Sequence, residues 1–264
     1  MAKAIKHNTD CVIYGRDASE TVVRSAIDEG VLDGRLEGNY DRIDLLLVAL
    51  YPLDVVDMIL ETAPKLSKGC IVIDCTGVKK IICDALSEKL SETGIRFIGG
   101  HPMAGREVSG YENSLKDLYN GASMILCRDE YTDEDALNEA CDFFPRLGFS
   151  RVKITTAEEH DRVIAYTSQL AHVVSSSYIK SPTCEKRYGF SAGSFKDMTR
   201  VAKLNEEMWA DLFLANDTAL VIEIDEIVAR LMEFGNAIAK RDRDMIVSLL
   251  RDGRIRKEKD SERE

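Results

Sequence analysis

The order of the apolar segments constrains the fold of this chain more than any other feature. Up to about residue 155, short runs rich in β-branched and aliphatic residues alternate with helical segments, which is typical of a parallel sheet with crossover helices. The candidate strands are Cys11–Tyr14, Ile43–Leu50, Cys70–Asp74, Arg96–Ile98, Ala122–Cys127 and Arg151–Ile154. Several of them are almost continuously apolar, which indicates burial on both faces. We therefore expect residues 1–155 to form an open α/β domain.

From about Thr156 the strand signals stop, and residues 156–264 are expected to form an all-helical domain. One apolar stripe recurs at intervals of 4, 3, 4 and 3 residues, which is typical of one face of a long helix; it comprises Leu220, Ile224, Ile227, Leu231 and Phe234. The stripe is either an intramolecular core face or a surface that pairs with a second subunit. The charged residues from Arg251 onward are expected to form a solvated, frayed end.

Charge and composition exclude several classes of function. The formal net charge is −11, so no basic face is broad enough for a nucleic-acid backbone. No apolar run approaches the roughly 20 residues that span a bilayer, and the N-terminus does not read as a signal peptide. The seven cysteines are scattered without a CxxC pair, so we expect neither a metal site nor disulfides. These features together predict a cytoplasmic protein.

Ligands of open α/β sheets bind beyond the carboxyl ends of the strands. The first candidate strand is followed by Gly15-Arg16-Asp17, where the Asp17 carboxylate could accept hydrogen bonds from the ribose hydroxyls of NAD. An aspartate that merely forms a turn is the alternative. Arg16 beside it leaves NADP open.

Two further strand ends carry glycines and polar groups. Residues 74–79 read DCTGVK, and residues 99–105 read GGHPMAG. Glycines on both sides of His101 allow a ligand to approach, and a histidine so placed can accept a proton or a hydrogen bond near neutral pH. A structural loop histidine is the alternative.

The helical half holds two pairs of polar residues with helical spacing. Gln169 and His172 are three residues apart, and Lys196 and Arg200 are four apart, with Asp197 placed to orient Arg200. A guanidinium held in this way suits bidentate capture of a carboxylate. Each pair alone could equally be a solvated face or a structural ion pair. Together with the strand-end groups they suggest a site between the two domains.

The stretch GGHPMAGREVSGYENSLKDLYNGASMIL, with DCTGVKK, SQLAH and the run from SFKDMTR to MWADLF, resembles the prephenate dehydrogenase family of tyrosine biosynthesis. The resemblance covers nearly the whole chain. It implies an NAD(P)-binding domain of the Rossmann type, an all-α domain that builds a homodimer, and oxidative decarboxylation of prephenate to 4-hydroxyphenylpyruvate. A hydride would pass to the nicotinamide while the ring carboxylate leaves as CO₂.

The resemblance also implies roles for single residues. His101 matches the family's catalytic histidine, and Arg200 matches the arginine that binds a substrate carboxylate. Asp17 falls at the ribose-binding position. The remaining matches in the substrate region are Lys196, Asp197, Trp209 and His172.

Three positions depart from the family pattern. Gly77 replaces a serine that would touch both histidine and substrate, and Thr76 could take over this role from one position earlier. Gln169 stands where many members carry histidine, and Arg106 where some carry threonine. These departures leave open the pH profile and the choice between prephenate and arogenate.

The largest departure concerns the start of the family pattern, which is a strand followed by a GxGxxG loop that holds the pyrophosphate. The match begins after that loop, with Met1–Lys6 as the last turns of its helix. The absent strand would lie between the strand that ends at Asp17 and the strand that begins near Ile43. Both neighbouring strands would therefore lose a ladder of hydrogen bonds. We expect roughly 25 residues to be missing, assuming one strand-loop-helix unit, and cofactor binding to be weak.

Two alternatives remain open at this point. The first is a non-catalytic homologue that keeps the dimer and a carboxylate-binding site. The second is another dehydrogenase with a Rossmann and a helical domain, such as a 3-hydroxyacid enzyme, although such an enzyme would lack the HPMAG and FKDMTR constellation.

Overall fold

The computed structural model describes residues 1–106 and 110–262. Ser109, part of the SG pair after the HPMAG motif, lies outside the described residues. The chain divides into two compact units, Met1–Asn216 and Asp217–Glu264. The helices between residues 157 and 214 belong to the same unit as the sheet, so this division falls later than the predicted domain boundary at residues 155 and 156.

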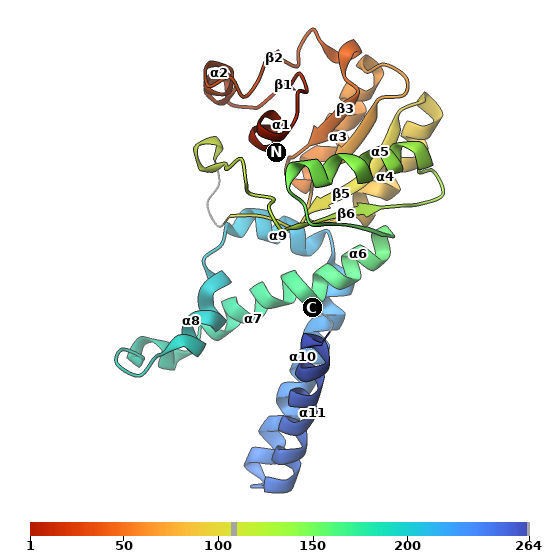
Figure 1. The fold of residues 1–264 in the computed structure, drawn as a ribbon. Helices are drawn as coiled ribbons and strands as arrows, with labels where there is room; N and C mark the ends of the chain where they lie inside the picture. The colour runs from red at the N-terminus through yellow and green to blue at the C-terminus, as the bar shows by residue number, and fades with distance from the viewer. Residues whose placement is uncertain (107–109, 263–264) are drawn as a thin grey trace. The chain divides into compact units, whose positions relative to one another are not determined.

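A five-stranded sheet with the order β3-β4-β5-β6-β7 forms the centre of the first unit (Figure 1). Its strands are β3 (Leu45–Val48), β4 (Ile71–Asp74), β5 (Arg96–Pro102), β6 (Ser123–Cys127) and β7 (Arg151–Thr155). The pairs β3-β4, β4-β5 and β6-β7 are parallel, and β5-β6 is antiparallel. The predicted open α/β sheet is therefore confirmed, with strands within a few residues of the predicted segments.

Strand β5 extends further than the sequence predicted. His101 and Pro102 were expected in a loop after the strand, but they pair with Ile125 and Met124 of β6. The antiparallel neighbour supplies ladder partners up to the strand end, and a proline is tolerated at such a position. A Cβ atom at Gly100 would lie 2.6 Å from the carbonyl oxygen of Asp74, so only glycine lets β4 and β5 approach this closely.

Two apolar layers cover the sheet. Val72 of β4 and Phe97 of β5 face the helices α3 (Pro52–Thr62) and α4 (Lys80–Thr93). The alternate residues of β4, such as Ile71 and Ile73, point to the other face, toward the helices α1 (Ala2–Asn8) and α5 (Glu134–Phe143). Because successive strand residues point to opposite faces, apolar runs of this kind are buried on both sides.

The N-terminal elements form a separate small sheet. Strand β1 (Tyr14–Gly15) pairs in parallel with β2 (Gly34–Arg35), and α2 (Glu20–Asp28) packs on them through Val23 and Ala26. The sequence predicted a longer strand from Cys11 and did not predict β2. Among the described residues, β1 pairs with β2 and not with a strand of the larger sheet.

Helices follow β7 to the end of the first unit. They are α6 (Ala157–Ile164), a π-helical turn at Ala165–Gln169, α7 (Leu170–Tyr178), α8 (Gly193–Thr199) and α9 (Glu206–Leu214). The Thr156 hydroxyl accepts a hydrogen bond from the Glu159 N–H and caps α6, and Asn205 caps α9 in the same way. Short 3-10 turns lie at Tyr40–Arg42, Ala63–Lys65, Tyr111–Asn113, Phe144–Leu147, Pro182–Lys186 and Arg200–Ala202.

The second unit is a helical hairpin of α10 (Asp217–Ala239) and α11 (Arg243–Ser261). The expected frayed end from Arg251 is wrong, because α11 continues to Ser261 with ion pairs such as Arg254 to Glu258 that support an exposed helix. The residues there are nevertheless exposed, as expected. The apolar stripe on α10 is also divided, since Leu220 is buried but Leu231 is 64% exposed.

Within the described part of the chain, no helix combines the length and the apolar character needed to cross a bilayer.

Candidate active site

Three polar side chains form a hydrogen-bonded row that begins at the end of β5. His101 Nδ1 lies 2.9 Å from His160 Nε2, and His160 Nδ1 lies 2.7 Å from Asp161 Oδ1. His160 and Asp161 are buried in the first turns of α6, whereas His101 is partly exposed. These three side chains thus connect a buried carboxylate with the partly exposed His101.

The contacts imply one arrangement of the protons when both imidazoles are neutral. A carboxylate only accepts hydrogen bonds, so His160 donates to Asp161 from Nδ1, and in a neutral ring its Nε2 is then the acceptor. His101 must then donate from Nδ1, which leaves its Nε2 as the acceptor. His101 is thereby held as a neutral imidazole whose Nε2 can accept a hydrogen bond or a proton.

The surroundings also disfavour a charged His101. Burial lowers the pKa of its imidazole to about 3, and the nearby His160 and Lys79 act in the same direction. A neutral ring over the physiological pH range is what a hydrogen-bond acceptor requires.

This depressed pKa predicts a pH dependence of stability. Between the ordinary pKa of 6.5 and about 3, unfolded His101 binds a proton that the folded residue does not bind. His101 therefore contributes stability that is present above pH 6.5 and is lost as the pH falls toward 3, at up to about 1.4 kcal/mol per pH unit. Urea unfolding of the wild type and of His101→Asn across this range should show a shallower slope for the variant. Equal slopes would contradict a neutral His101, and the exposed His7→Asn serves as the control.

Asp161 is held by the start of helix α4. Its Oδ1 accepts a hydrogen bond from the backbone N–H of Lys79, and its Oδ2 accepts one from the N–H of Lys80, each at 2.8 Å. A carboxylate at a helix N-terminus satisfies free N–H groups and interacts favourably with the helix dipole. Asp161 therefore joins α6 to α4 and orients His160. No role was predicted from the sequence for His160 or Asp161, and their adjacency within a helical segment was the available signal.

A fully buried ion pair braces the strand end beneath His101. The ammonium group of Lys79 contacts the Asp74 carboxylate and donates to the carbonyl oxygen of Gly100 at 2.6 Å. The Asp74 carboxylate also accepts from the Gly100 N–H at 3.2 Å. Asp74 and Lys79 thus tie β4, β5 and the start of α4 together, one residue before His101.

Thr76 belongs to the same buried network. Its hydroxyl lies 2.7 Å from Asp74 Oδ2, 2.9 Å from the Val78 carbonyl oxygen and 3.1 Å from Lys79 Nζ. These contacts use its hydrogen-bonding capacity within the network, and none of them involves His101. The geometry therefore gives Thr76 a structural role, and its predicted catalytic role remains a prediction.

Gly77, by contrast, lies directly beside His101. A Cβ atom at this position would lie 3.9 Å from His101 Nε2 and 3.3 Å from a methyl group of Leu212. Glycine at this position places no side chain between the backbone and His101 Nε2. Helix α9, which carries Leu212, closes the neighbouring side.

Gln169 is buried, and both polar atoms of its side chain are hydrogen-bonded. Its Nε2 donates to the Leu212 carbonyl oxygen at 3.0 Å, and its Oε1 accepts from Asn216 at 2.8 Å. Asn216 also donates to the Asp161 carbonyl oxygen at 2.9 Å. Gln169 therefore positions α9 against α6, and its predicted contact with substrate remains a prediction.

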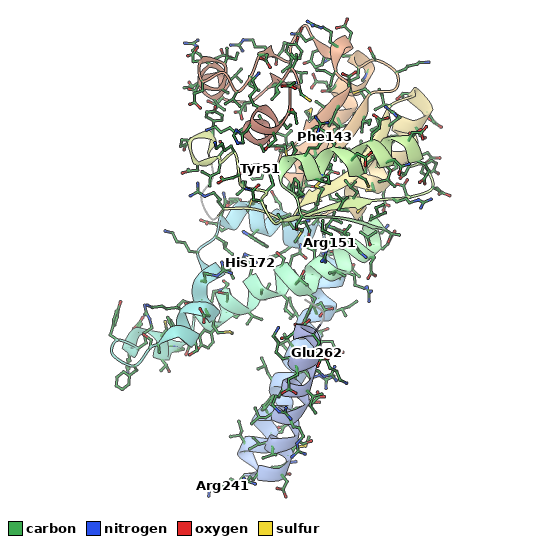
Figure 2. The ribbon with its side chains drawn as sticks, in the orientation of Figure 1. Tyr51, Phe143, Arg151, His172, Arg241 and Glu262 are labelled. Atoms are coloured by element: carbon green, nitrogen blue, oxygen red, sulfur yellow. The ribbon has the colours of Figure 1, made fainter. Side chains whose placement is uncertain are left out.

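The remaining substrate candidates lie along α7 and its neighbours. His172, labelled in Figure 2, stacks on Trp209 with ring centroids 3.6 Å apart, and its Nδ1 donates to the Ser168 carbonyl oxygen. Lys196 and Asp197 are exposed on α8, and Arg200 is exposed at the start of the next turn, which packs on α7. Arg106 donates to the Asn113 carbonyl oxygen in the segment after β5.

The predicted cofactor residues lie at the end of β1. Asp17 is exposed, and its Oδ1 accepts a hydrogen bond from the Ser19 N–H at 2.8 Å, which is the turn-forming alternative. Its ribose-binding role remains a prediction. Arg16 lies 3.7 Å from Glu37 in an ion pair. Both residues line a large cavity together with the end of β3. The sequence contains no GxGxxG motif, so no phosphate contact is assigned.

Comparisons with known proteins agree with this architecture. Residues 1–153 match the family model described as the nucleotide-binding domain of prephenate dehydrogenase, and residues 156–252 match that of its dimerization domain. The cyclohexadienyl dehydrogenase of Zymomonas mobilis is 35% identical over 193 residues, which cover 70% of this chain and 64% of that protein. The prephenate dehydrogenase of Lactococcus lactis is 26% identical over 258 residues, covering 94% of this chain and 70% of that protein.

A solved structure shares the fold over almost the whole chain. The prephenate dehydrogenase of Aquifex aeolicus, in complex with hydroxyphenyl propionate and NAD⁺, superposes with a TM-score of 0.81 and 28% identity. The match covers 98% of this chain and 92% of that one.

The five-stranded sheet with helices on both faces, followed by further helices, places the protein in the class of α/β proteins with a Rossmann-like domain and a helical continuation. Because the two family models together match residues 1–153 and 156–252, the chain belongs to the prephenate dehydrogenase family. The resemblance inferred from the sequence is thereby confirmed. The chain spans just under two thirds of the length of the Zymomonas relative.

Proposed function

We propose that this protein oxidises prephenate with NAD⁺ and releases CO₂ to give 4-hydroxyphenylpyruvate, a step of tyrosine biosynthesis. The observation that carries the proposal is the proton arrangement at His101. Its Nδ1–H is committed to His160, and its Nε2 is left as an acceptor at the end of β5. This is the group needed to bind the ring hydroxyl of prephenate.

His101 acts on that hydroxyl in the proposed reaction. Its Nε2 accepts the hydrogen bond and draws the O–H proton toward itself, which raises the electron density on the oxygen as the hydride leaves the same carbon. NAD⁺ supplies the hydride acceptor. The electron pair of the bond to the leaving carboxylate enters the ring, which becomes aromatic. Asp161 and His160 hold the acceptor nitrogen in place throughout.

The substrate carboxylates require cationic partners. Lys196 and Arg200 are exposed, and the turn that contains Arg200 packs on α7, the helix of His172. We assign Arg200 to one carboxylate by bidentate contact and Lys196 to electrostatic support, with Asp197 orienting Arg200. The stacked His172 and Trp209 would form a flat wall for the ring.

NAD is preferred to NADP because of the charges at the end of β1. Asp17 offers a carboxylate oxygen for ribose hydroxyls and would repel a 2′-phosphate. Arg16, the residue that could favour the phosphate, is paired with Glu37. The Aquifex relative is solved with NAD⁺, which supports the same choice. Gly77 would lie near the nicotinamide end, since it adjoins His101.

Steady-state assays test the proposal. Purified protein should reduce NAD⁺ in the presence of prephenate and release an equal amount of CO₂. Parallel assays with arogenate and NADP⁺ distinguish the related activities, and higher kcat/KM with arogenate would revise the substrate. Binding of prephenate by calorimetry with no turnover would instead support the non-catalytic homologue.

The position of Gly77 yields a prediction about the acceptor nitrogen. Gly77→Ser should place a hydroxyl within hydrogen-bond reach of His101 Nε2, because the new Cβ would lie 3.9 Å from that nitrogen. We expect the pH profile of kcat/KM to shift measurably, since a hydrogen bond to one protonation state changes the pKa of the ring. Gly77→Ala, which adds the same Cβ without the hydroxyl, is the matched control. Identical pH profiles for both variants would contradict the placement.

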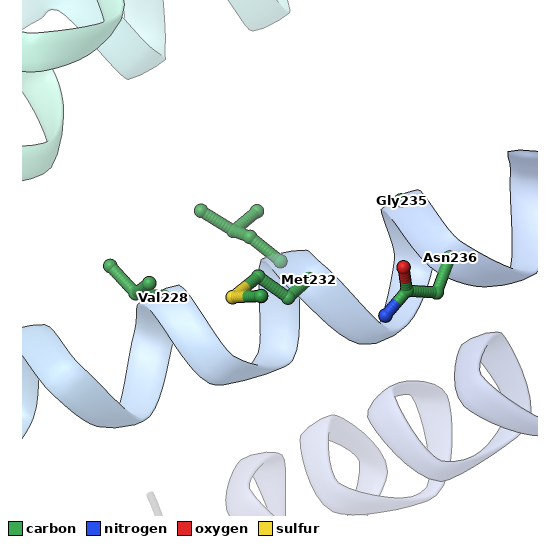
Figure 3. Close-up of a pocket in the computed structure, with 5 residues that line it drawn as sticks. Val228, Met232, Gly235 and Asn236 are labelled. Atoms are coloured by element: carbon green, nitrogen blue, oxygen red, sulfur yellow. The ribbon is translucent and has the colours of Figure 1, made fainter.

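We further propose that the protein works as a homodimer. The family model for residues 156–252 is described as a dimerization domain. Within the second unit, a groove of about 400 Å³ on α10 is lined by Val228, Leu231, Met232, Gly235 and Asn236. Figure 3 shows Val228 and Met232 along this face of the helix. Exposed apolar side chains of this kind suit contact with a second copy.

A further inference from the structure

A leucine of α9 lies near the Nε2 edge of His101. A Cβ atom at Gly77 would lie 3.3 Å from Leu212 Cδ2, 3.9 Å from His101 Nε2 and 4.0 Å from His101 Cε1. These are contact distances, so the leucine methyl group and the imidazole edge lie around the same point. Leu212 is partly buried there, whereas Leu214 of the same helix is 74% exposed. The apolar side chain on this side of the imidazole therefore comes from α9 and not from residue 77.

The position of Leu212 is fixed through its backbone. Gln169 Nε2 donates a hydrogen bond to the Leu212 carbonyl oxygen at 3.0 Å, and Gln169 Oε1 accepts one from Asn216 at 2.8 Å. Asn216 also donates to the carbonyl oxygen of Asp161 at 2.9 Å. Gln169 and Asn216 are both buried, where hydrogen bonds are stronger than in water. These bonds attach α9 to α6 beside the leucine.

Helix α6 holds the imidazole as well. His160 Nε2 lies 2.9 Å from His101 Nδ1, and the next residue, Asp161, carries the carbonyl oxygen that accepts from Asn216. Two consecutive residues of one helix therefore hold the ring of His101 and, through the buried amides, the helix of Leu212. This arrangement keeps the ring and the leucine at a constant separation, because both are attached to the same rigid element.

The leucine adds neither charge nor a hydrogen-bonding side chain to the surroundings of His101. The ionisable groups that act on the imidazole are His160 of α6 and Lys79 just before α4. Asp161 is bonded to His160, and Asp74 is paired with Lys79. Burial is nevertheless the largest cause of the lowered pKa of His101. Apolar side chains at the ring edge contribute to this burial, because they displace water that would otherwise stabilise the charged form.

We propose that Leu212 is a positioning residue for the proposed reaction, whose isobutyl group shields the Nε2 edge of His101 from water on the side where Gly77 has no side chain. The ring hydroxyl of the substrate then approaches the acceptor nitrogen from the remaining side, so the direction of its hydrogen bond is restricted. This restricted approach rests on the proposed function. The shielding itself is a property of the protein without ligand and is measured independently of turnover.

Modification with diethyl pyrocarbonate tests the shielding in the protein without ligand. This reagent acylates neutral imidazole nitrogens, and peptide mapping by mass spectrometry gives a separate rate for each histidine. At pH 7 we expect Leu212→Ala to raise the rate at His101 about fivefold or more, because the lost methyl groups leave a cavity at the ring edge. Leu214→Ala is the matched control and should leave that rate unchanged. No increase in a folded Leu212→Ala protein would overturn the proposal.

Two other histidines report in the same sample whether the variant is folded. His7 is exposed and should react at one rate in every variant, whereas His160 is buried and should stay slow. If His160 also reacts faster, Leu212→Ala has lost its fold, and Leu212→Val then takes its place. Removing one methylene group should raise the rate at His101 about twofold, and an unchanged rate would again overturn the proposal.

Steady-state kinetics test the positioning. We expect Leu212→Ala to lower kcat about tenfold and to leave KM within about threefold of the wild type, because orientation is lost rather than binding. Leu212→Met, which nearly conserves volume, should retain most of the activity. If His101 became more reactive toward the reagent while kcat stayed unchanged, Leu212 would have no positioning role. A wild-type protein without turnover of prephenate would instead contradict the proposed function, and the modification rates would still decide the shielding.

Discussion

Replacing His101 by asparagine is expected to reduce kcat by about 10²–10⁴-fold, the range that a positioned general base or acceptor contributes. The asparagine side chain can still donate to His160 Nε2, so the hydrogen bonds that run through His160 to Asp161 are kept. Its amide oxygen is a far weaker base than the imidazole Nε2. The loss should therefore fall on the chemical step rather than on folding. Single-turnover kinetics with NAD⁺ and prephenate measure that step directly.

Two controls accompany this variant. His7→Asn changes an exposed histidine of α1 and should leave kcat unchanged. Thermal unfolding of His101→Asn at pH 7 establishes that the variant is folded. A folded His101→Asn protein with a kcat within threefold of the wild type would remove His101 from the proposed mechanism.

Replacing Lys79 by methionine is expected to destabilise the protein by about 3–5 kcal/mol, because it leaves the buried Asp74 carboxylate without its cation. Both side chains of this ion pair are inaccessible to solvent. The Gly100 carbonyl oxygen would also lose a donor. Urea unfolding at pH 7 measures the change, and Lys89→Met on the exposed side of α4 is the matched control.

A second substitution separates charge from packing. Asp74→Asn combined with Lys79→Met removes both charges and should recover part of the lost stability, since no unpaired buried charge remains. If Lys79→Met alone were as stable as Lys89→Met, the Asp74 and Lys79 pair would not be buried in solution. Because the pair braces Gly100 beside His101, we also expect Lys79→Met to lower kcat in the protein that remains folded.

The fold was largely predictable from local patterns. The continuous apolar runs at Ile43–Leu50 and Cys70–Asp74 predicted buried strands, and the structure has β3 and β4 there. The prediction failed where the outcome depended on a distant partner. His101 and Pro102 continue β5 because β6 pairs with them, and β2 forms because β1 lies beside it. The exposed α11 is likewise held by ion pairs along a segment that composition alone suggested would fray.

The candidate site was predictable in part. The glycines around His101 predicted a residue near a ligand, and the resemblance to the family predicted its role. The sequence did not indicate that Thr76 and Gln169 would be enclosed by buried hydrogen bonds. Nor did it indicate that His160 and Asp161 would orient His101, since they lie 59 and 60 residues further along the chain (160 − 101 and 161 − 101).

The sequence by itself determined the α/β class, the helical continuation and the family. These follow from local periodicity and from motifs, which are properties of neighbouring residues. The tertiary structure decided the contact between His101 and His160, the burial of the Asp74 and Lys79 pair, and the pairing of β1 with β2. Each of these depends on groups from separate elements meeting in space, because hydrogen bonds and burial are set by packing and not by order along the chain.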